Sequence, residues 1–367
     1  MRSDRRRFLA KASGALAGVA MAAVADAPRV IAQPKIQWRL STAYPPVLDQ
    51  LHGAAQRLAK IVEETSDGRF RIEVFPGGQI MKPFECFDAA SQGTIQAFMG
   101  VTSYWAALGK EPAVEWFTTL PFGMNPQGMA AWYHQGDGLK LWEEAYAGYN
   151  LVPRPGPAFA PQMAGWFRKK IATIADFKGL KMRISSLGRK IVARAGATTV
   201  LTPAADIYAG LERGVIDAAE WVGPHDDMKL NLHNTARYYY YPGWHEPGTT
   251  NEFSFNKKAY DALPVDLKRT LDHAAAAVSV YGVTDYHTKN GIALERLRTE
   301  FRGKVEVLPL PAPVLRDLKK LALEVIREES DKTPMARKVH ASFTKFQALV
   351  TPWDRVAEGA YHQLVGA

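Results

Sequence analysis

Cysteine and long hydrophobic runs are the two features that this sequence has least of. Cys86 is the only cysteine among 367 residues, which excludes an internal disulfide framework and a cysteine-rich metal cluster. Beyond the N-terminal region, no stretch reaches the roughly twenty apolar residues that a membrane-spanning helix needs. Solenoid repeats and low-complexity linkers are also missing. With 47% apolar and 23% charged residues the composition is globular, and the length predicts two lobes rather than one core.

The net charge outside the N-terminal region is also low. The chain has 46 lysines and arginines against 37 acidic residues, a formal charge of +9. Residues 1–32 contain six of the basic groups and two acidic ones, which leaves about +5 spread over the rest of the chain. A protein of this size needs no phosphate backbone to explain such a charge, so we expect no nucleic-acid partner.

The first 32 residues have the layout of an export signal. A basic cluster precedes an apolar run of small residues at 12–25, which is too short to span a membrane. The string RRRFLAK is similar to the twin-arginine consensus, with Arg5 and Arg6 as the pair. Asp4 departs from it, because serine or threonine is commoner there. This pattern is favoured over a buried N-terminal helix and predicts a periplasmic protein exported by the twin-arginine route.

Two cleavage sites are compatible with this signal. Residues 30–32, Val-Ile-Ala, fit a small-x-small site and predict a mature chain that starts near Gln33. Residues 25–27, Ala-Asp-Ala, are a rival site, weakened by Pro28 directly after it.

Common enzyme motifs are missing as well. The sequence contains no GxSxG elbow, no GxxxxGK(S/T) loop, no HExxH and no GxGxxG after a strand, and its nine histidines lack zinc-type spacing. Cys86 lies in a predicted helix, where a buried structural thiol is favoured over a nucleophile. His225, Asp226 and Asp227 follow Pro224, which favours a helix start with acids at its positive end over a ligand-binding role.

Apolar periodicity predicts an α/β fold. Residues 36–40 alternate between apolar and polar and predict a strand, residues 51–64 have helical spacing, and residues 70–74 alternate again. A β–α–β unit within forty residues indicates parallel strand pairing. The other expected helices cover 84–98, 204–213, 265–298 and 314–329, and the other expected strands cover 100–105, 166–167, 181–184, 218–222, 238–241, 253–255 and 305–307.

Several strings resemble one protein family over about residues 35–350. They are DFKGLKMR at 176–183, AADIYAGLERGVIDAAEWVGP at 204–224, FPGGQ at 75–79 and TLPFGM at 119–124. Together they resemble the periplasmic solute receptors of tripartite ATP-independent periplasmic (TRAP) transporters. WVGPHDD and YYYYPGWHEPG look like the subgroup that takes small 2-oxo and 2-hydroxy monocarboxylates together with a cation.

The resemblance implies a two-lobe α/β periplasmic binding protein with an interlobe cleft, a helix that spans both lobes and further C-terminal helices. After the signal at 1–32 we expect the first part of lobe I at 33–157 and lobe II at 158–243. A crossover back with the lobe-spanning helix then covers 244–310, and the C-terminal helices cover 311–367.

The expected ligand contacts centre on Arg183, at the end of a short predicted strand from which its side chain can project into a cleft. A guanidinium forms two parallel, charge-assisted hydrogen bonds with a carboxylate. The resemblance adds Gln162 and Glu246 around the ligand. Tyr44 and Tyr104, in predicted loops after strands, are expected to cap it.

The resemblance also implies a cation beside the ligand. Glu220 would donate its side chain and Trp221 its backbone oxygen, and neighbours on a strand cannot both point into the cleft. Gln162 and Glu246 complete the expected ligand set. All of these donors are hard oxygens, which favours Na⁺ or Ca²⁺ and no organic cofactor.

The function that the sequence predicts is capture of a small organic acid, such as pyruvate or lactate, for delivery to the membrane subunits of a TRAP permease, without catalysis. The alternatives are a periplasmic carboxylate-processing enzyme and a sensor-coupled binding protein. A further expected partner is a second copy of the chain. The apolar stripe at 314–329 suits a homodimer that exchanges a C-terminal helix, and packing on its own lobe is equally compatible with it.

Overall fold

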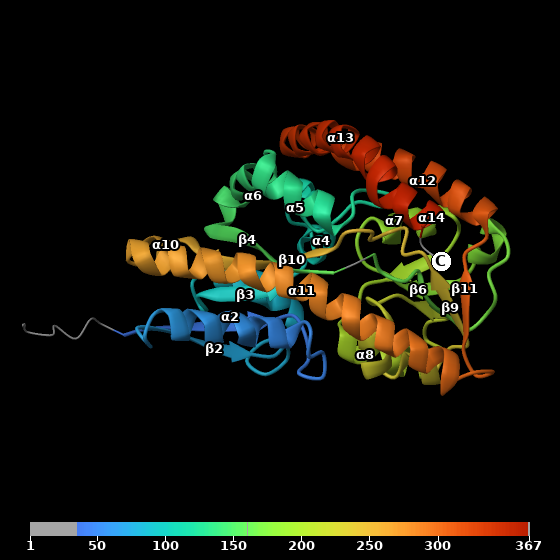
Figure 1. Ribbon diagram of the computed structural model, residues 1–367, viewed down its shortest axis with the longest axis horizontal. Coiled ribbons are helices and arrows are strands. Elements are labelled where there is room, and N and C mark those ends of the chain that lie inside the picture. The colour runs from blue at the N-terminus through green and yellow to red at the C-terminus, as the bar shows by residue number, and fades with distance from the viewer. Residues whose placement is uncertain (1–34, 160, 366–367) are drawn as a thin grey trace, which may run out of the picture. The chain divides into compact units, whose positions relative to one another are not determined.

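The structure, a computed structural model, describes residues 35–159 and 161–365. The predicted signal at 1–32 and its cleavage site lie outside these residues. Two β-sheets organise the described chain (Figure 1). The first has the order β2-β1-β3-β10-β4, with bounds Phe70–Phe75, Ile36–Thr42, Ala97–Gly100, Thr250–Asn256 and Leu151–Ala158. The second has the order β11-β9-β5-β8-β6-β7, with bounds Glu306–Pro309, Tyr238–Tyr241, Gly165–Phe167, Ala218–Ala219, Lys181–Arg183 and Thr198–Val200.

Helices pack around both sheets. Their bounds are α2 His52–Thr65, α3 Cys86–Ser91, α4 Thr102–Ala107, α5 Pro126–Gln135, α6 Gly138–Tyr146, α7 Gly188–Arg194, α8 Ala204–Glu212, α9 Pro224–Lys229, α10 Lys257–Asp261, α11 Val265–Thr299, α12 Ala312–Ser330, α13 Pro334–Asp354 and α14 Ala360–Leu364. In the described part of the chain, no helix combines the length and apolar character that crossing a membrane requires.

The predicted β–α–β unit is confirmed. Strands β1 and β2 pair in parallel, with α2 between them in the sequence. The alternating residues Trp38 and Leu40 are buried, and the Trp38 ring meets the ring of Phe70 edge-on at 4.9 Å between centroids. The period of two therefore predicted correctly which face of β1 enters the core.

The chain passes twice between the two sheets before α11. It leaves the first sheet after β4, enters the second at β5, and returns from β9 to β10, which pairs antiparallel with both β3 and β4. The two connecting segments, 159–164 without residue 160 and 242–249, therefore link the two sheets in the described part of the chain. They carry Gln162 and Glu246, two of the residues predicted to bind ligand.

Helix α11 is a single helix of 35 residues, packed on α2 and β4 and further along on α9 (Figure 1). Gly282 lies inside this helix and allows close packing against β4. A Cβ atom there would lie 2.8 Å from the Ala158 carbonyl oxygen, so a larger residue would push α11 away from β4.

Two of the predicted elements are wrong. The helix expected over 84–98 ends at Ser91, and 97–100 form β3 between β1 and β10. The strand expected over 100–105 is helix α4 from Thr102 onward. Thr102 is buried there, and its hydroxyl lies 2.7 Å from that of Thr118 in a distant segment. Tertiary pairing decided both cases, because short apolar segments have little conformational preference of their own.

Candidate functional site

Six of the seven predicted site residues line one small cavity, and the seventh lies directly behind it. The cavity has a volume of about 20 Å³. Its walls are Tyr44, Leu51, Val101, Tyr104, Phe159, Gln162, Arg183, Ser185, Trp221, Val222, Glu246 and Thr249. They come from loops and helix α4 beside the first sheet, from the ends of β6 and β8 in the second, and from the two connecting segments. The site therefore lies where the two halves of the fold meet.

The two connecting segments are bonded to each other beside the cavity. The Gln162 N–H donates to the Glu246 carbonyl at 3.2 Å, and the Gly243 N–H donates to the Gln162 carbonyl at 2.7 Å. A Cβ atom on Gly243 would lie only 2.2 Å from that carbonyl oxygen. Only glycine allows this approach. The pair of segments thus fixes where the Gln162 and Glu246 side chains start.

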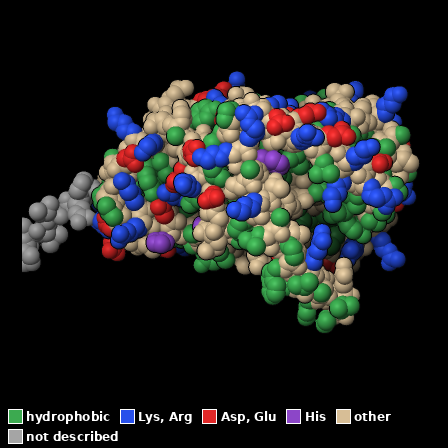
Figure 2. All heavy atoms as spheres, turned by 90° about the horizontal axis from the view of Figure 1, so that it is seen from above, with side chains coloured by type: hydrophobic (Ala, Val, Ile, Leu, Met, Phe, Trp, Pro, Cys, Tyr) green, Lys and Arg blue, Asp and Glu red, His purple; other side chains and the backbone are tan. Residues whose placement is uncertain are grey.

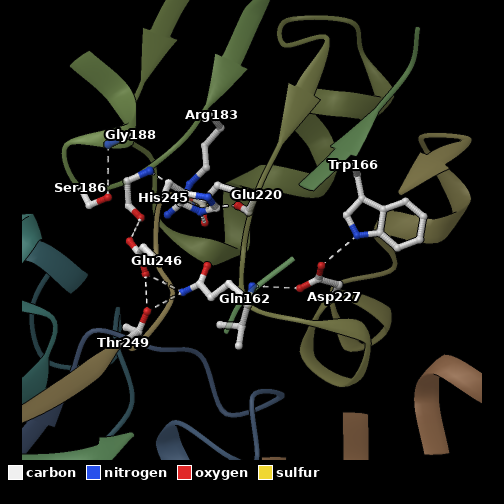
Figure 3. Close-up of polar contacts among 12 residues, drawn as sticks. Gln162, Trp166, Arg183, Ser186, Gly188, Glu220, Asp227, His245, Glu246 and Thr249 are labelled. Atoms are coloured by element: carbon white, nitrogen blue, oxygen red, sulfur yellow. Dashed lines mark hydrogen bonds and ion pairs between the residues drawn. The ribbon is translucent and has the colours of Figure 1, made fainter. Parts of the chain in front are cut away.

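Arg183 ends β6, as predicted, and its side chain is buried (Figure 3). Its Nη1 donates to the Glu220 carboxylate at 2.5 Å and to the Glu220 carbonyl at 2.9 Å, and its Nε donates to the Thr202 carbonyl at 3.3 Å. The guanidinium also lies 5.0 Å from the centroid of the Trp221 ring. Among the described residues, only its Nη2 finds no hydrogen-bond partner.

Glu220 pairs with Arg183 and is fully buried. One oxygen also accepts from the Ser185 N–H at 2.7 Å. The other oxygen lies 3.5 Å from His245 Nε2 and has no hydrogen-bond partner among the described residues. Burial by itself raises the pKa of Glu220, but Arg183, His245 and the Ser185 N–H together hold that pKa below its usual value. Glu220 is therefore an anion inside the protein.

Glu246 is the second buried carboxylate. It accepts from the Ser185 hydroxyl at 2.7 Å, from the Gln162 amide at 2.5 Å and from the Thr249 hydroxyl at 2.8 Å (Figure 3). Burial raises the pKa of Glu246, and the charge of Glu220 raises it further. Because the Gln162 amide nitrogen is directed to Glu246, its amide oxygen is turned the other way, towards the Arg183–Glu220 pair, and finds no partner among the described residues.

The two tyrosines face the cavity from the first half of the fold. Tyr44 lies in the loop after β1, and its hydroxyl donates to Asn251 Oδ1 at 2.5 Å. Its ring meets the Trp221 ring edge-on at 6.2 Å between centroids. Tyr104 lies in α4 rather than in the expected loop, and its ring packs 4.9 Å from that of Phe84. Both hydroxyls have pKa values above the usual range, first of all because of burial, and stay neutral.

Sequence reasoning missed part of the polar lining. Ser185 and Thr249 were not singled out, although both donate to Glu246. Ser185 follows Arg183 by two residues, the spacing that keeps side chains on one face of an extended segment, so this position offered a signal. Thr249 offered none, because its place depends on the return segment. The two neighbours point to opposite faces, but Trp221 lines the cavity while the Glu220 side chain lies behind Arg183, whereas the resemblance implied that Glu220 would offer its side chain and Trp221 its backbone oxygen.

The group formed by His225, Asp226 and Asp227 has a structural place. It begins helix α9, as predicted. Asp227 accepts from Trp166 Nε1 at 2.9 Å (Figure 3). It also accepts from the Tyr239 hydroxyl at 2.8 Å and from the Val222 N–H at 3.1 Å, which holds the segment after Trp221.

Asp49, His225 and Asp226 approach one another closely enough to hold a metal ion. Asp49, however, already pairs with His225 and with Lys289, each at 2.9 Å. A lysine ammonium on the same carboxylate opposes a cation there, so this group links the loop after β1 to α9 and α11 instead.

Unpartnered polar atoms gather around the cavity. Among the described residues they include two side-chain oxygens, Gln162 Oε1 and Glu220 Oε2, and the nitrogens Arg183 Nη2, Trp221 Nε1, His245 Nδ1 and His245 Nε2. Buried polar groups in proteins are nearly always hydrogen-bonded. The donors suit an anion and the oxygens suit a cation, so the arrangement can hold both, side by side.

Comparison with known proteins places the chain among transport receptors. Residues 42–332 match the model of a family described as bacterial extracellular solute-binding protein, family 7. A monocarboxylate 2-oxoacid-binding periplasmic protein of Nostoc is 36% identical over 334 residues, which cover 91% of this chain and 90% of that protein.

Two solved structures are similar over nearly their full length. A TRAP transporter solute-binding protein from Bordetella bronchiseptica, a mixed-occupancy dimer with copurified calcium and picolinate in one active site and an apo site, has a TM-score of 0.87 at 35% identity. It covers 90% of this chain and 97% of its own. One from Pseudoalteromonas atlantica with bound sodium and pyruvate has a TM-score of 0.86 at 35% identity, covering 90% and 99%. The predicted α/β two-lobe binding-protein fold is confirmed by these matches. The chain is a solute receptor rather than an enzyme, and it belongs to family 7 of the bacterial extracellular solute-binding proteins.

Proposed function

We propose that this protein captures a small 2-oxo or 2-hydroxy monocarboxylate together with a sodium or calcium ion and delivers it to the membrane subunits of a TRAP transporter. The observation that supports this most directly is the set of buried, unpartnered donors and acceptors around one cavity. Leaving such atoms unpaired costs free energy, and a carboxylate with an adjacent cation would pair with both kinds. The relatives that hold picolinate with calcium and pyruvate with sodium favour the same combination.

Arg183 is the proposed anchor for the carboxylate. Glu220 and Thr202 already accept hydrogen bonds from its Nη1 and Nε, so only Nη2 is free to donate. The ligand's carboxylate would therefore receive its hydrogen bonds from this one nitrogen, and not the two parallel bonds from two nitrogens that the sequence predicted. Gln162 and Glu246 shape the polar side of the pocket. Tyr44 and Tyr104 supply aromatic walls on the side of the first sheet.

The cation would lie on oxygens of this chain. Gln162 Oε1 and Glu220 Oε2 are the unpartnered acceptors, and the Trp221 carbonyl is the third proposed donor. Glu246, whose oxygens already accept three hydrogen bonds, adds charge to the ion site rather than a free oxygen. Hard oxygen donors suit Na⁺ and Ca²⁺ and disfavour zinc and copper. A bound cation would offset the two buried carboxylates and give a 2-oxo acid its second contact.

Native mass spectrometry of the mature protein tests this proposal. We expect a copurified species whose added mass equals one small 2-oxo or 2-hydroxy acid plus one sodium or calcium ion, and whose ligand is recovered chemically unchanged. A protein that carries neither, and that gives no heat with pyruvate or lactate in sodium or calcium buffer, contradicts it. Genes for a pair of membrane permease subunits beside this one favour transport, whereas a neighbouring histidine kinase favours the sensor alternative.

The two sheets are the proposed cores of two lobes. Residues 33–157 form the first part of lobe I, 158–243 form lobe II, 244–310 return through β10 and α11, and 311–367 form the C-terminal helices. Since the cavity walls come from both sheets and from the connecting segments, ligand binding would favour a closed arrangement of the lobes. A permease that fits only this arrangement would thereby recognise the loaded receptor.

Export by the twin-arginine route is the first prediction. The secreted protein is expected to begin near Gln33, and replacing Arg5 and Arg6 together by lysine is expected to leave it in the cytoplasm, because that route reads the arginine pair itself. N-terminal sequencing of the periplasmic fraction and immunoblots of both fractions measure this. A secreted form that retains residues 1–32, or normal export of the double-lysine variant, would show that the segment is not such a signal.

Dimer formation through the C-terminal helices is the second prediction. Residues Val314, Leu318 and Val325 of the predicted apolar stripe are buried in this chain, but the chain after Phe343 carries exposed apolar side chains. They include Leu349 at 72%, Trp353 at 67% and Val356 at 69% exposure. Figure 2, which looks onto the side where α13 lies, shows mixed charges with hydrophobic side chains projecting at one edge. Exposed apolar groups of this size are typical of an interaction surface, and a second copy is the proposed occupant.

Sedimentation of the mature protein is expected to show a dimer, and Leu349→Glu with Trp353→Glu is expected to yield a folded monomer. These point variants are preferable to removing everything after Arg302, which would also remove the buried face of α12. The exposed substitution Leu108→Glu, far from this face in the sequence, is the matched control. A wild-type monomer, or a dimer that survives both substitutions, would rule out this interface.

A further inference from the structure

A second cavity, with a volume of about 250 Å³, shares no residue with the carboxylate pocket. Its walls come from the segment between α4 and the short helix η2 (Pro112–Phe117), from the start of α7, and from the turn between α12 and α13. Its charged side chains are four cations and two acids: Lys110, Arg189, Lys190, Lys332, Glu115 and Glu329. The cavity therefore has an excess of positive groups at a junction of three parts of the fold.

The ion pairs in this cavity do not neutralise all of its positive side chains. Glu329 accepts from Lys190 at 2.6 Å and from Lys332 at 2.8 Å, so one carboxylate serves two lysines. Burial lowers the pKa of Lys190, and the neighbouring Lys332 lowers it further, while Glu329 opposes both effects. The Arg189 side chain has no hydrogen bond or ion pair with any residue in the described ranges, and its Nε is buried. An added anion would relieve this imbalance.

Glu115 faces the same cavity and is only 5% exposed. Its Oε1 finds no hydrogen-bond partner in the part of the chain that the structure describes. Burial is the main cause that raises the pKa of Glu115 to about 8, because the effects of Lys190 and Arg189 in the opposite direction are smaller. At neutral pH this carboxyl group therefore holds its proton. It adds no negative charge to the cavity and offers an O–H donor instead.

We propose that this cavity is a second anion site, which binds one small oxyanion of carboxylate, sulfate or phosphate chemistry between Arg189, Lys190 and Glu115. Hydrogen bonds from a guanidinium and an ammonium to an oxyanion are among the strong ones in proteins. The volume admits an ion of several heavy atoms. Ser186 forms part of the wall, next to Ser185, which donates to Glu246 in the carboxylate pocket (Figure 3). The two sites are therefore neighbours with separate linings.

The affinity of this site for an oxyanion is expected to fall as the pH rises. The groups that face Glu115 are Lys110 beside η2, Arg189 and Lys190 on α7, Glu329 and Lys332 at the end of α12, and Glu246 on the return segment. An oxyanion adds negative charge beside Glu115 and so favours the protonated carboxyl group. Affinity is highest below pH 8 and falls as the pH rises through that value, because ionised Glu115 repels the anion.

Calorimetric titration of the mature protein tests the site, with the carboxylate pocket first filled by one equivalent of pyruvate in sodium buffer, so that no excess pyruvate competes for the second cavity. Sodium sulfate and sodium acetate are titrated separately at constant ionic strength and at pH 6.5, 7.5 and 9. We expect one sulfate per chain, bound more weakly at pH 9 than at pH 6.5. Acetate binding in place of sulfate would identify a carboxylate site of the same kind. No heat from either ion at any pH overturns the proposal.

Three substitutions make the test specific. Arg189→Met and Lys190→Met are each expected to weaken sulfate binding by about tenfold or more, while pyruvate affinity stays unchanged. Glu115→Gln, which imitates the protonated carboxyl group, is expected to keep sulfate binding and to remove its pH dependence. Arg194→Met is the matched control, since Arg194 lies on the same helix but pairs with Glu324 and Glu328 at the surface. Sulfate binding that survives both Arg189→Met and Lys190→Met, or a pH dependence that persists in Glu115→Gln, overturns the assignment.

Discussion

Replacing Arg183 by methionine is expected to lower affinity for the 2-oxo acid by roughly 2–5 kcal/mol, which is roughly 30- to 5,000-fold. The guanidinium is buried, and its Nη2 is the cationic donor in the carboxylate pocket without a protein partner among the described residues. Without it, the ligand's carboxylate would be buried next to Glu220 and Glu246. Isothermal titration with pyruvate in sodium and in calcium buffer measures the loss.

The ion pair with Glu220 adds a second effect of the same substitution. Arg183→Met leaves the fully buried Glu220 carboxylate without its cation, so the ligand-free protein is expected to lose roughly 3–5 kcal/mol of unfolding free energy. From the sequence alone we would expect stability without ligand to stay unchanged. The double variant Arg183→Met with Glu220→Gln is expected to recover much of the stability but none of the affinity.

Lys181→Met provides the matched control for Arg183. Lys181 lies two residues earlier on the same strand and is exposed, so its loss is expected to change neither affinity nor stability appreciably. If Arg183→Met binds pyruvate as tightly as the wild type, Arg183 is only the structural partner of Glu220, and the ligand's carboxylate is bound elsewhere.

Removing sodium and calcium is expected to weaken binding of the 2-oxo acid by several kcal/mol, about a hundredfold or more. Arg183 contributes one positive charge to the pocket, whereas Glu220, Glu246 and the ligand contribute one negative charge each. Calcium would neutralise the remaining charge of −2. Sodium would leave −1, and since Glu246 is only 2% exposed, water cannot offset it. Sharing of a proton between Glu246 and the ligand or His245 would then be needed.

Titrations in chelator-treated buffer, with choline as the only counter-ion, measure this dependence, and adding back one ion at a time identifies the cation. Glu220→Gln is expected to weaken both ion and ligand, because it removes the charge of the unpartnered oxygen. Glu306→Gln is the control, since Glu306 pairs with Arg237 at the edge of the same sheet. Full affinity in choline buffer would mean that Arg183 alone balances the ligand.

Local patterns in the sequence were sufficient for several features of this protein. The alternation at 36–40 and 70–74 identified β1, β2 and their buried faces, because a strand that packs on one side repeats every two residues. The acidic residues after Pro224 identified the start of α9, because capping depends on a few adjacent residues. The DFKGLKMR string at 176–183 and the string at 204–224 indicated the family, and they drew attention to Arg183 and Glu220 respectively.

Tertiary structure alone decided how those residues are used. Chain segments that are distant in sequence meet at the cavity, and no local pattern could show that Glu220 occupies Arg183 Nη1 or that Ser185 and Thr249 donate to Glu246. The boundary between α3 and β3 depends on pairing of β3 with β10, more than 150 residues away. The second cavity likewise depends on α7 meeting the turn after α12. The periodicity of a local segment shows which of its faces is buried. Which distant residues that face contacts is decided by the packing of the whole fold and by the pairing of buried charges.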